Sequence, residues 1–238
     1  MTSLSRYIIA VRQLYINSEL NEWEAIVVKE FRTIKSIYNV ELESKIIDNN
    51  SEVLVVILPG IGYTLDRPLL DYSKKLCMEL GYDVLPIEYG FQAARVQFDS
   101  ERFNNLLDES MEILKISLSS KYKKIVFIGK SIGTVVQKIL QKRLKDENDS
   151  YHFENIYLTP VDKTVDLGIE AGSLVFTGSC DPLISKGNVH KLEKIEGLKL
   201  IKITDADHSL NIKNDVVKST EYLMNIIKKE KDYLLMKI

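Results

Sequence analysis

The sequence has few of the residues that build disulfide-stapled or metal-stabilised folds. It contains 2 cysteines and 3 histidines in 238 residues. Cys77 and Cys180 cannot make a disulfide framework, and no His, Cys and carboxylate residues cluster at metal-ligand spacing in the sequence. We therefore expect a fold that depends on an ordinary apolar core, and we expect neither a metal nor another cofactor.

Long apolar runs and an excess of charge of one sign are also lacking. No segment approaches the roughly 20 apolar residues that span a bilayer. The apolar run at residues 7–11 is too short for a signal peptide, and Arg12 follows it directly. A net charge of −2 gives no electrostatic reason to bind nucleic acid or an anionic membrane. We expect a cytoplasmic protein with no nucleic-acid partner and no membrane partner.

The composition is that of a soluble globular protein. Hydrophobic residues make up 45% of the chain and charged residues 28%, which are ordinary values. The length suits one large core, and no repeat, low-complexity tract or linker interrupts the sequence. We predict one domain over residues 1–238, and homo-oligomerisation stays open.

From residue 53 onward, strand-like apolar runs alternate with amphipathic helical patterns. Short apolar runs predict strands at residues 53–58, 83–88, 125–128, 155–158, 173–177 and 198–203. Helical periodicity predicts helices at about 69–80, 100–117, 132–144 and 216–229. This alternation predicts an α/β fold with a mostly parallel central sheet and helices on both faces.

The first 50 residues are harder to assign. Residues 7–11 and 25–28 each suit a strand or a buried helix segment. Apolar residues on alternate positions between residues 38 and 46 predict a half-buried strand near 37–47.

A Gly-x-Ser-x-Gly pentapeptide, Gly129 to Gly133, joins a predicted strand to a predicted helix. In this context the turn must be tight, and the Ser131 side chain stands at its tip. Glycine at both ends keeps Cβ atoms out of a crowded turn. The N-terminus of the following helix would favour negative charge beside the serine. The alternative is a plain strand–helix turn with an incidental serine.

A serine nucleophile needs a base, and the base needs a carboxylate. In a parallel sheet, residues that follow different strands meet at the carboxyl edge. His208 follows the last predicted strand, whereas His152 precedes a strand and His190 lies in a predicted helix. We therefore predict His208 as the base.

Three aspartates compete for the carboxylate position. Asp181 follows a predicted strand and a Gly-Ser turn, Asp162 follows the preceding strand, and Asp207 is adjacent to His208. Neighbouring loop residues usually point apart, which disfavours Asp207. The chain order Ser131, Asp181, His208 is typical of a serine on an elbow of this type, so we predict Asp181, with Asp162 as the alternative.

Acyl transfer also needs donors for the developing oxyanion. We predict the backbone N–H of Ile132 and that of Ile61, with Gly62 as the alternative to Ile61. The Gly60–Gly62 loop lacks the Lys-Ser/Thr pair of a Walker motif and the third glycine of a dinucleotide fingerprint, so we expect no nucleotide.

Several further residues near these turns are candidates for a substrate pocket. Tyr63, Tyr89 and Phe91 could line a pocket wall or pack in the core. Lys130 could attract an anionic substrate or point into the surrounding structure. Gly62 would let substrate approach the backbone closely.

Three motifs carry a family resemblance: Gly129–Gly133, Gly178-Ser179-Cys180-Asp181-Pro182 and Asp205–Leu210. With them, the chain from about residue 53 to the C-terminus resembles the α/β-hydrolase superfamily, and most of all its small esterase and dienelactone-hydrolase-like branch. The resemblance implies Ser131 as nucleophile, Asp181 as acid and His208 as base. It also implies antiparallel early strands in the sheet.

The sequence departs from these relatives in two places. Pro59-Gly60 stands where many relatives have His-Gly, which could shape the oxyanion loop differently. The segment between Pro160 and Ser173 is too short for the helical lid of many lipases, so we expect no large lid and a short or soluble acyl substrate.

These observations together predict a cytoplasmic serine hydrolase that cleaves a carboxylic ester or thioester of a small-molecule acyl substrate. A peptidase or an acyltransferase with the same three residues is the nearest alternative. A binding protein that retains the fold without catalysis is the alternative from another class.

Overall fold

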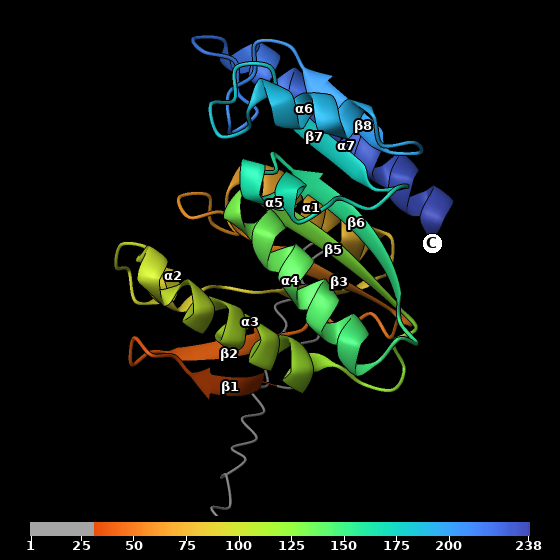
Figure 1. Cartoon of the computed structure of the whole chain (residues 1–238). Helices are drawn as coiled ribbons and strands as arrows, with labels where there is room; N and C mark the ends of the chain where they lie inside the picture. The colour runs from red at the N-terminus through yellow and green to blue at the C-terminus, as the bar shows by residue number, and fades with distance from the viewer. Residues whose placement is uncertain (1–30) are drawn as a thin grey trace, which may run out of the picture.

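The computed structural model describes residues 31–238, which form a small and a large β-sheet (Figure 1). The large sheet has six strands in the order β4-β3-β5-β6-β7-β8, and each neighbouring pair is parallel. Its strands are β3 (Val53–Leu58), β4 (Asp83–Pro86), β5 (Lys124–Lys130), β6 (His152–Leu158), β7 (Leu174–Gly178) and β8 (Lys199–Ile203).

Helices cover both faces of this sheet because its central strands are apolar on both sides. In β3, Val55 and Ile57 pack with residues of α1 (Pro68–Glu79) and α7 (Val216–Lys237), whereas Leu54 and Val56 pack with residues of α3 (Phe103–Ser117) and α4 (Ile132–Glu147). The helices are α1 (Pro68–Glu79), α2 (Gly90–Ala93), α3 (Phe103–Ser117), α4 (Ile132–Glu147), α5 (Asp162–Asp166), α6 (Lys186–Glu193) and α7 (Val216–Lys237), and a 3₁₀ turn spans Ser100–Arg102. The predicted α/β architecture is confirmed.

Most predicted elements lie where the sequence pattern indicates, with shifted ends. The helix α7 runs to Lys237 instead of stopping near residue 229, and β6 begins at His152 instead of residue 155. The α7 extension includes the buried residues Tyr233 and Leu234, and the β6 extension begins with the exposed His152.

The prediction of one strand at 37–47 is wrong in its first half. The strands β1 (Phe31–Lys35) and β2 (Glu41–Lys45) form an antiparallel pair, and residues 36–40 are the turn between them. The Ser36 N–H donates to the Val40 carbonyl at 2.9 Å, and Asn39 takes the left-handed conformation with φ 58°. The alternation of apolar residues continues through this turn, so periodicity alone could not locate it.

The early strands are antiparallel, as the resemblance implies, but they form a sheet of their own. This two-stranded sheet packs on α3, β2 also contacts β4, and Ile47, just after β2, forms an antiparallel bridge with Val84 (Figure 1). The segments 7–11 and 25–28 lie outside the described residues.

The connection from β6 to β7 carries only α5, a helix of 5 residues. The expectation that the chain has no large lid is therefore confirmed. No helix of residues 31–238 combines the length and the apolar character that a membrane crossing needs.

The interface between α1 and α7 contains a buried carboxyl group. Glu230 of α7 is fully buried, and within the described residues neither of its oxygens has a hydrogen-bond partner. Burial raises its pKa to about 8, and the nearby Ser73 side chain partly opposes this rise. Glu230 also raises the pKa of the buried Cys77 thiol, which burial has already raised. The carboxyl group therefore carries a proton in the folded protein at neutral pH.

This proton makes stability depend on pH. In the unfolded chain the carboxyl ionises near its ordinary pKa of 4.5, whereas in the folded protein it ionises near 8. The folded state thus binds one more proton between these values, so the free energy of unfolding falls as pH rises from about 4.5 to about 8. We predict that Glu230→Gln, which is neutral and similar in shape, raises the free energy of unfolding at pH 8 by on the order of 2 kcal/mol.

Urea unfolding of the wild type and Glu230→Gln at pH 5 and pH 8 measures this effect. Glu221→Gln, a change on the exposed face of the same helix, is the matched control and should change little at either pH. A gain for Glu230→Gln that is equal at both pH values would contradict the assignment.

Candidate active site

The turn at Ser131 is a strained strand-to-helix elbow. Ser131 follows β5 and is the N-cap residue of α4, with φ 56° and ψ −121°. A non-glycine residue at positive φ costs on the order of 1–3 kcal/mol and persists only where its surroundings enforce it. The Ser131 N–H donates to the Leu158 carbonyl at 3.0 Å, and the Thr134 N–H donates to the Ser131 carbonyl at 2.9 Å. These bonds to β6 and α4 hold the serine in its strained geometry.

The two glycines of the pentapeptide are sterically required. A Cβ on Gly133 would lie 2.4 Å from the Leu58 carbonyl oxygen, and one on Gly129 would lie 2.7 Å from the Gly133 carbonyl oxygen. Both distances are far below van der Waals contact with backbone that cannot move aside. The close approach of β3, β5 and α4 at this point therefore depends on the missing side chains.

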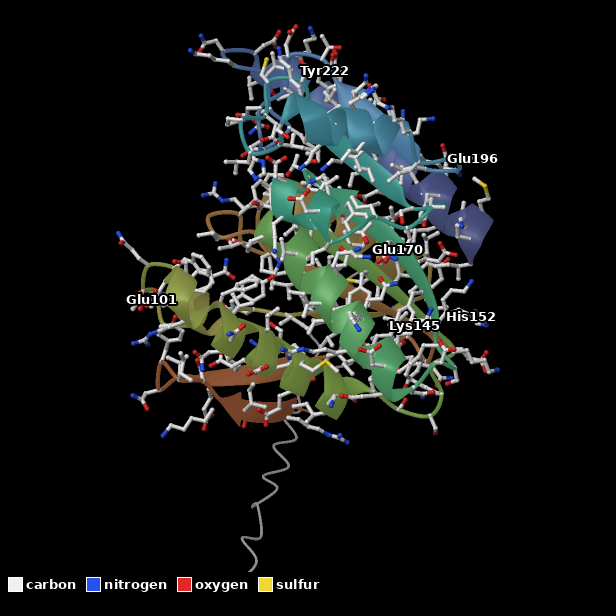
Figure 2. The ribbon with its side chains drawn as sticks, in the orientation of Figure 1. Glu101, Lys145, His152, Glu170, Glu196 and Tyr222 are labelled. Carbon is white, nitrogen blue, oxygen red and sulfur yellow. The ribbon has the colours of Figure 1, made fainter. Side chains whose placement is uncertain are left out.

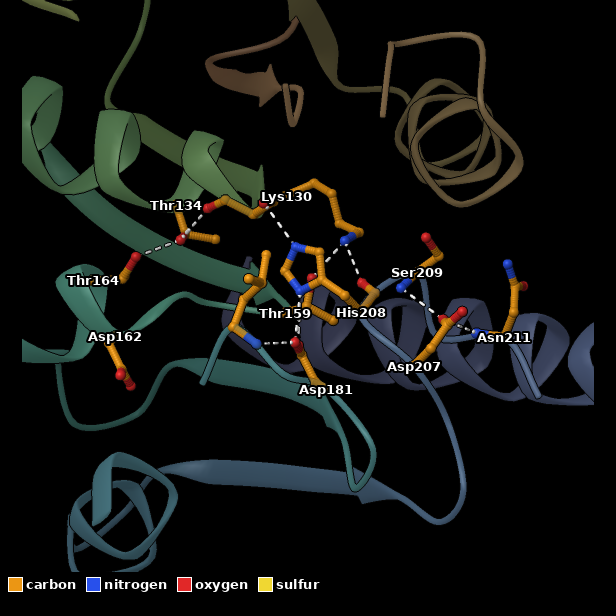
Figure 3. Close-up of polar contacts among 12 residues, drawn as sticks. Lys130, Thr134, Thr159, Asp162, Thr164, Asp181, Asp207, His208, Ser209 and Asn211 are labelled. Atoms are coloured by element: carbon orange, nitrogen blue, oxygen red, sulfur yellow. Dashed lines mark hydrogen bonds and ion pairs between the residues drawn. The ribbon is translucent and has the colours of Figure 1, made fainter. Parts of the chain in front are cut away.

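His208 bridges Ser131 and Asp181. Its Nε2 lies 2.8 Å from the Ser131 Oγ, and its Nδ1 lies 2.9 Å and 2.8 Å from the two Asp181 carboxylate oxygens. An ionised carboxylate only accepts hydrogen bonds, so Nδ1 carries the proton and Nε2 accepts from the serine hydroxyl. Figure 3 shows the imidazole lying between the elbow and the Asp181 carboxylate. The arrangement can transfer the serine proton to the imidazole.

Burial differs along this chain of three residues. The Asp181 side chain is fully buried, whereas the His208 side chain keeps 21% of its surface exposed. The Leu183 N–H also donates to Asp181 Oδ1 at 2.9 Å, which fixes the carboxylate at the start of its loop. The carboxylate is thus shielded from water, and the imidazole remains reachable from outside.

The other two candidate aspartates form hydrogen bonds within loops and not with the His208 ring. Asp162 accepts hydrogen bonds from Ser185 N–H and the Asn188 side-chain amide, both at 2.8 Å, and the Ser185 N–H lowers its pKa. Its carboxylate points away from His208 (Figure 3). Asp207 accepts from the Ser209 and Asn211 N–H groups at 2.8 and 3.0 Å. It braces the loop that carries the histidine.

The loops that carry Asp181 and His208 are joined to each other. The Cys180 N–H donates to the Ala206 carbonyl at 2.9 Å, and the Asp205 N–H donates to Ser179 Oγ at 2.8 Å. A Cβ on Gly178 would lie 2.2 Å from the Ala206 carbonyl oxygen. Glycine at the end of β7 therefore permits the contact that brings the carboxylate to the imidazole.

The remaining histidines lie elsewhere. His152 begins β6, at the end of the sheet opposite the elbow (Figure 2). His190 lies in α6 and contacts Glu193 on the surface. Neither can reach Ser131, as their sequence positions predict.

The loop after β3 lies against the elbow. A Cβ on Gly60 would come within 3.2 Å of the Ser131 Cβ. Among residues 31–238, neither the Ile61 N–H nor the Ile132 N–H donates a hydrogen bond to a backbone carbonyl. Both predicted oxyanion donors are therefore free on the two segments that flank the serine. Gly62 has no atom within 4 Å of the position of a Cβ.

Lys130 is buried beneath the site and does not face solvent. It is 0% exposed, and its ammonium donates to Thr159 Oγ1 at 2.5 Å and to the His208 carbonyl at 2.7 Å (Figure 3). It also lies 5.0 Å from the centre of the Tyr63 ring. Lys130 is therefore not a pocket residue, which corrects that candidate role. Its side chain points into the surrounding structure and holds the histidine loop.

Of the two tyrosine candidates, one lies beside the site and the other lies in the core. Tyr63 is half-buried, and its hydroxyl accepts from the Leu69 N–H at 3.0 Å. Tyr89 is 1% exposed and stacks on Phe91 in the core, with ring centres 5.9 Å apart. The structure thus places Tyr89 and Phe91 in the core and leaves Tyr63 beside the site.

Sequence comparison finds no matching family model and no matching curated protein. Structural comparison finds similar folds. A Coxiella burnetii α/β serine hydrolase homologue matches with TM-score 0.64 and 15% identity over 88% of this chain and 99% of that chain. XC6422 from Xanthomonas campestris, described as an α/β serine hydrolase without a lid, matches with TM-score 0.62 and 13% identity over 87% and 94%.

Est1E from Butyrivibrio proteoclasticus, solved with bound ferulic acid, matches with TM-score 0.65 and 13% identity over 87% of this chain and 98% of that chain. At such low identity the likeness shows the architecture. The chain has the α/β-hydrolase fold, without a large lid.

The buried lysine leads to a prediction. Burial lowers the pKa of Lys130 to about 8, and the charges of Asp181 and Asp207 partly oppose this shift. We predict that one lysine of the protein titrates near pH 8 and that its signal is missing in Lys130→Met. Asp181→Asn removes a nearby negative charge and should lower the pKa of Lys130 further.

Nuclear magnetic resonance of ¹³Cε-labelled lysines measures this titration directly. Asp166→Asn removes an exposed carboxylate that pairs with Lys191, and it should leave the titration of Lys130 unchanged. The absence of any lysine that titrates below about pH 9.5 would contradict the burial argument.

Proposed function

We propose that this protein is a serine hydrolase that cleaves a carboxylic ester or thioester. The observation that carries the proposal is the hydrogen-bonded chain from Ser131 Oγ through His208 to the buried Asp181 carboxylate, on an elbow at positive φ. Such strain is stored where a side chain must be presented. The likeness of the fold to serine hydrolases and esterases supports the same class.

The first half of the reaction forms an acyl-enzyme. Ser131 Oγ attacks the acyl carbon while His208 Nε2 takes its proton, and the Asp181 carboxylate stabilises the imidazolium. The N–H groups of Ile61 and Ile132 bind the oxyanion. The intermediate collapses when the bond from carbon to the leaving oxygen or sulfur breaks and Nε2 returns its proton to the leaving group.

Water completes the cycle. It attacks the acyl carbon, gives a proton to Nε2, and the second intermediate expels Ser131 Oγ, which takes that proton back. The product is a carboxylic acid, and the free enzyme is restored.

A site without a large lid favours short or soluble acyl groups. The connection from β6 to β7 has no room for a lid, and His208 is partly exposed. A large apolar chain would gain little burial in such a site. The ferulic acid bound to Est1E, a compact aromatic acid, agrees with a small acyl group.

Labelling with a fluorophosphonate probe tests the proposal first. We predict that the wild type is labelled, that Ser131→Ala is not, and that His208→Ala reacts at least about 10³-fold more slowly because the serine loses its base. Asp181→Asn should slow the reaction by about 10²–10⁴-fold because the carboxylate no longer orients the imidazole. Asp162→Asn is the matched control and should keep wild-type reactivity.

A panel of p-nitrophenyl esters and acyl thioesters of increasing chain length then measures hydrolysis. Labelling that survives Ser131→Ala would reject the serine assignment. A well-folded wild type without labelling would favour a binding protein that retains the fold. Product that forms only with an added amine or alcohol acceptor would favour an acyltransferase, and cleavage of peptides but not esters a peptidase.

A further inference from the structure

The Gly60–Ile61 peptide must have a defined orientation for the proposed oxyanion site to work. The described residues contain no cis peptide bond. In a planar trans peptide, the carbonyl of one residue and the N–H of the next point in opposite directions. A group that holds the Gly60 carbonyl therefore also aims the Ile61 N–H.

Gln92 is such a group. Its Nε2 donates to the Gly60 carbonyl at 2.8 Å and to the Ile61 carbonyl at 3.3 Å. One side-chain amide thus holds two successive peptides of the loop that follows β3. The second bond constrains the Gly62 N–H by the same reasoning, although the first is shorter and stronger.

The orientation of the Gln92 amide is itself determined. Its Oε1 accepts from the Tyr89 N–H at 3.5 Å, while both partners of Nε2 are carbonyl oxygens. A reversed amide would place Oε1 against two carbonyls, which is repulsive. The side chain therefore donates to the loop and accepts from its own helix.

The helix that carries Gln92 is tightly fixed. A Cβ on Gly90 would lie 2.2 Å from Ser36 Oγ and 2.6 Å from Glu109 Oε2. Phe91 is buried and contacts the rings of Tyr89 and Phe98. The short helix α2 is thus held by the small sheet and α3 together, and it gives Gln92 a rigid base.

The loop has little else to orient this peptide. The Gly60 N–H donates to the Tyr63 carbonyl at 2.9 Å and closes the turn. Within residues 31–238, Gln92 is the donor to the Gly60 and Ile61 carbonyls. Glycine at position 60 leaves the peptide free to rotate when this donor is absent.

We infer that Gln92 is a positioning residue that orients the Ile61 N–H toward the oxyanion of the ester hydrolysis proposed above. The inference rests on that proposed function. Gln92 acts through the backbone of the loop after β3 and does not touch the reacting atoms. Its contribution should therefore appear when negative charge develops on the substrate oxygen, and much less when substrate binds.

Two substitutions separate this role from simple packing. Gln92→Met keeps the length of the side chain and removes the donor, and Gln92→Glu keeps the shape and replaces the donor with an acceptor. Removal of a direct oxyanion donor costs about 10²–10³ in kcat. For this indirect donor we expect kcat to fall about 10–100-fold, with KM changed less than about threefold.

The inhibition constant of a trifluoromethyl ketone is a measurement that a merely structural role of Gln92 would not change. Its adduct with Ser131 carries the oxyanion, so its inhibition constant should rise by the same factor by which kcat/KM falls. Gln97→Ala, an exposed glutamine after the same helix, is the matched control and should keep wild-type values.

The outcomes distinguish this inference from the proposed function. Wild type that neither hydrolyses esters nor reacts with fluorophosphonate would overturn the proposed function. Active wild type with unchanged kcat and ketone inhibition in Gln92→Met would overturn the role of Gln92 alone. A parallel loss of kcat/KM and ketone affinity in both variants would support it.

Discussion

The parallel pairing of β3 with β5 is the constraint on which the candidate site depends. The two strands end within one residue of each other, with Leu58 opposite Gly129, so the loop after one strand lies against the elbow after the other. Gly133 allows α4 to begin where a Cβ would lie 2.4 Å from the Leu58 carbonyl oxygen. Because backbone meets backbone here, the serine and the proposed oxyanion donors share one rigid frame.

Two buried ionisable side chains, Lys130 and Glu230, differ in their partners and in whether they carry a charge. Lys130 is buried beside the site but has a hydroxyl, a carbonyl and an aromatic ring as partners, and the charges of Asp181 and Asp207 favour its protonated form. Glu230 is buried between helices without such partners and avoids the cost of charge by keeping its proton. A buried ion with partners can hold a loop in place, whereas an unpartnered acid lowers stability as pH rises.

Much of the fold was predictable because local patterns agree with the final structure. Continuous apolar runs predict strands buried on both faces, and the glycines around Ser131 predict a tight turn. His208 was identifiable because it alone of the three histidines follows a strand. The turn at residues 36–40 was not predictable, because the apolar alternation runs through it unchanged. The side chains of Lys130 and Tyr89 also could not be oriented from their neighbours in the sequence.

By itself, the sequence determined the α/β class, the elbow at Ser131 and the choice of His208 among the three histidines, because each follows from a pattern of residues close together in the chain. Only the tertiary structure decided between Asp181 and Asp162, since both follow strands and only the packing of Gly178 against Ala206 brings one carboxylate to the imidazole. It also decided the place of Gln92, whose partners are 31 and 32 residues away in the chain. Contacts over such separations depend on how strands are ordered in the sheet, which local periodicity does not specify.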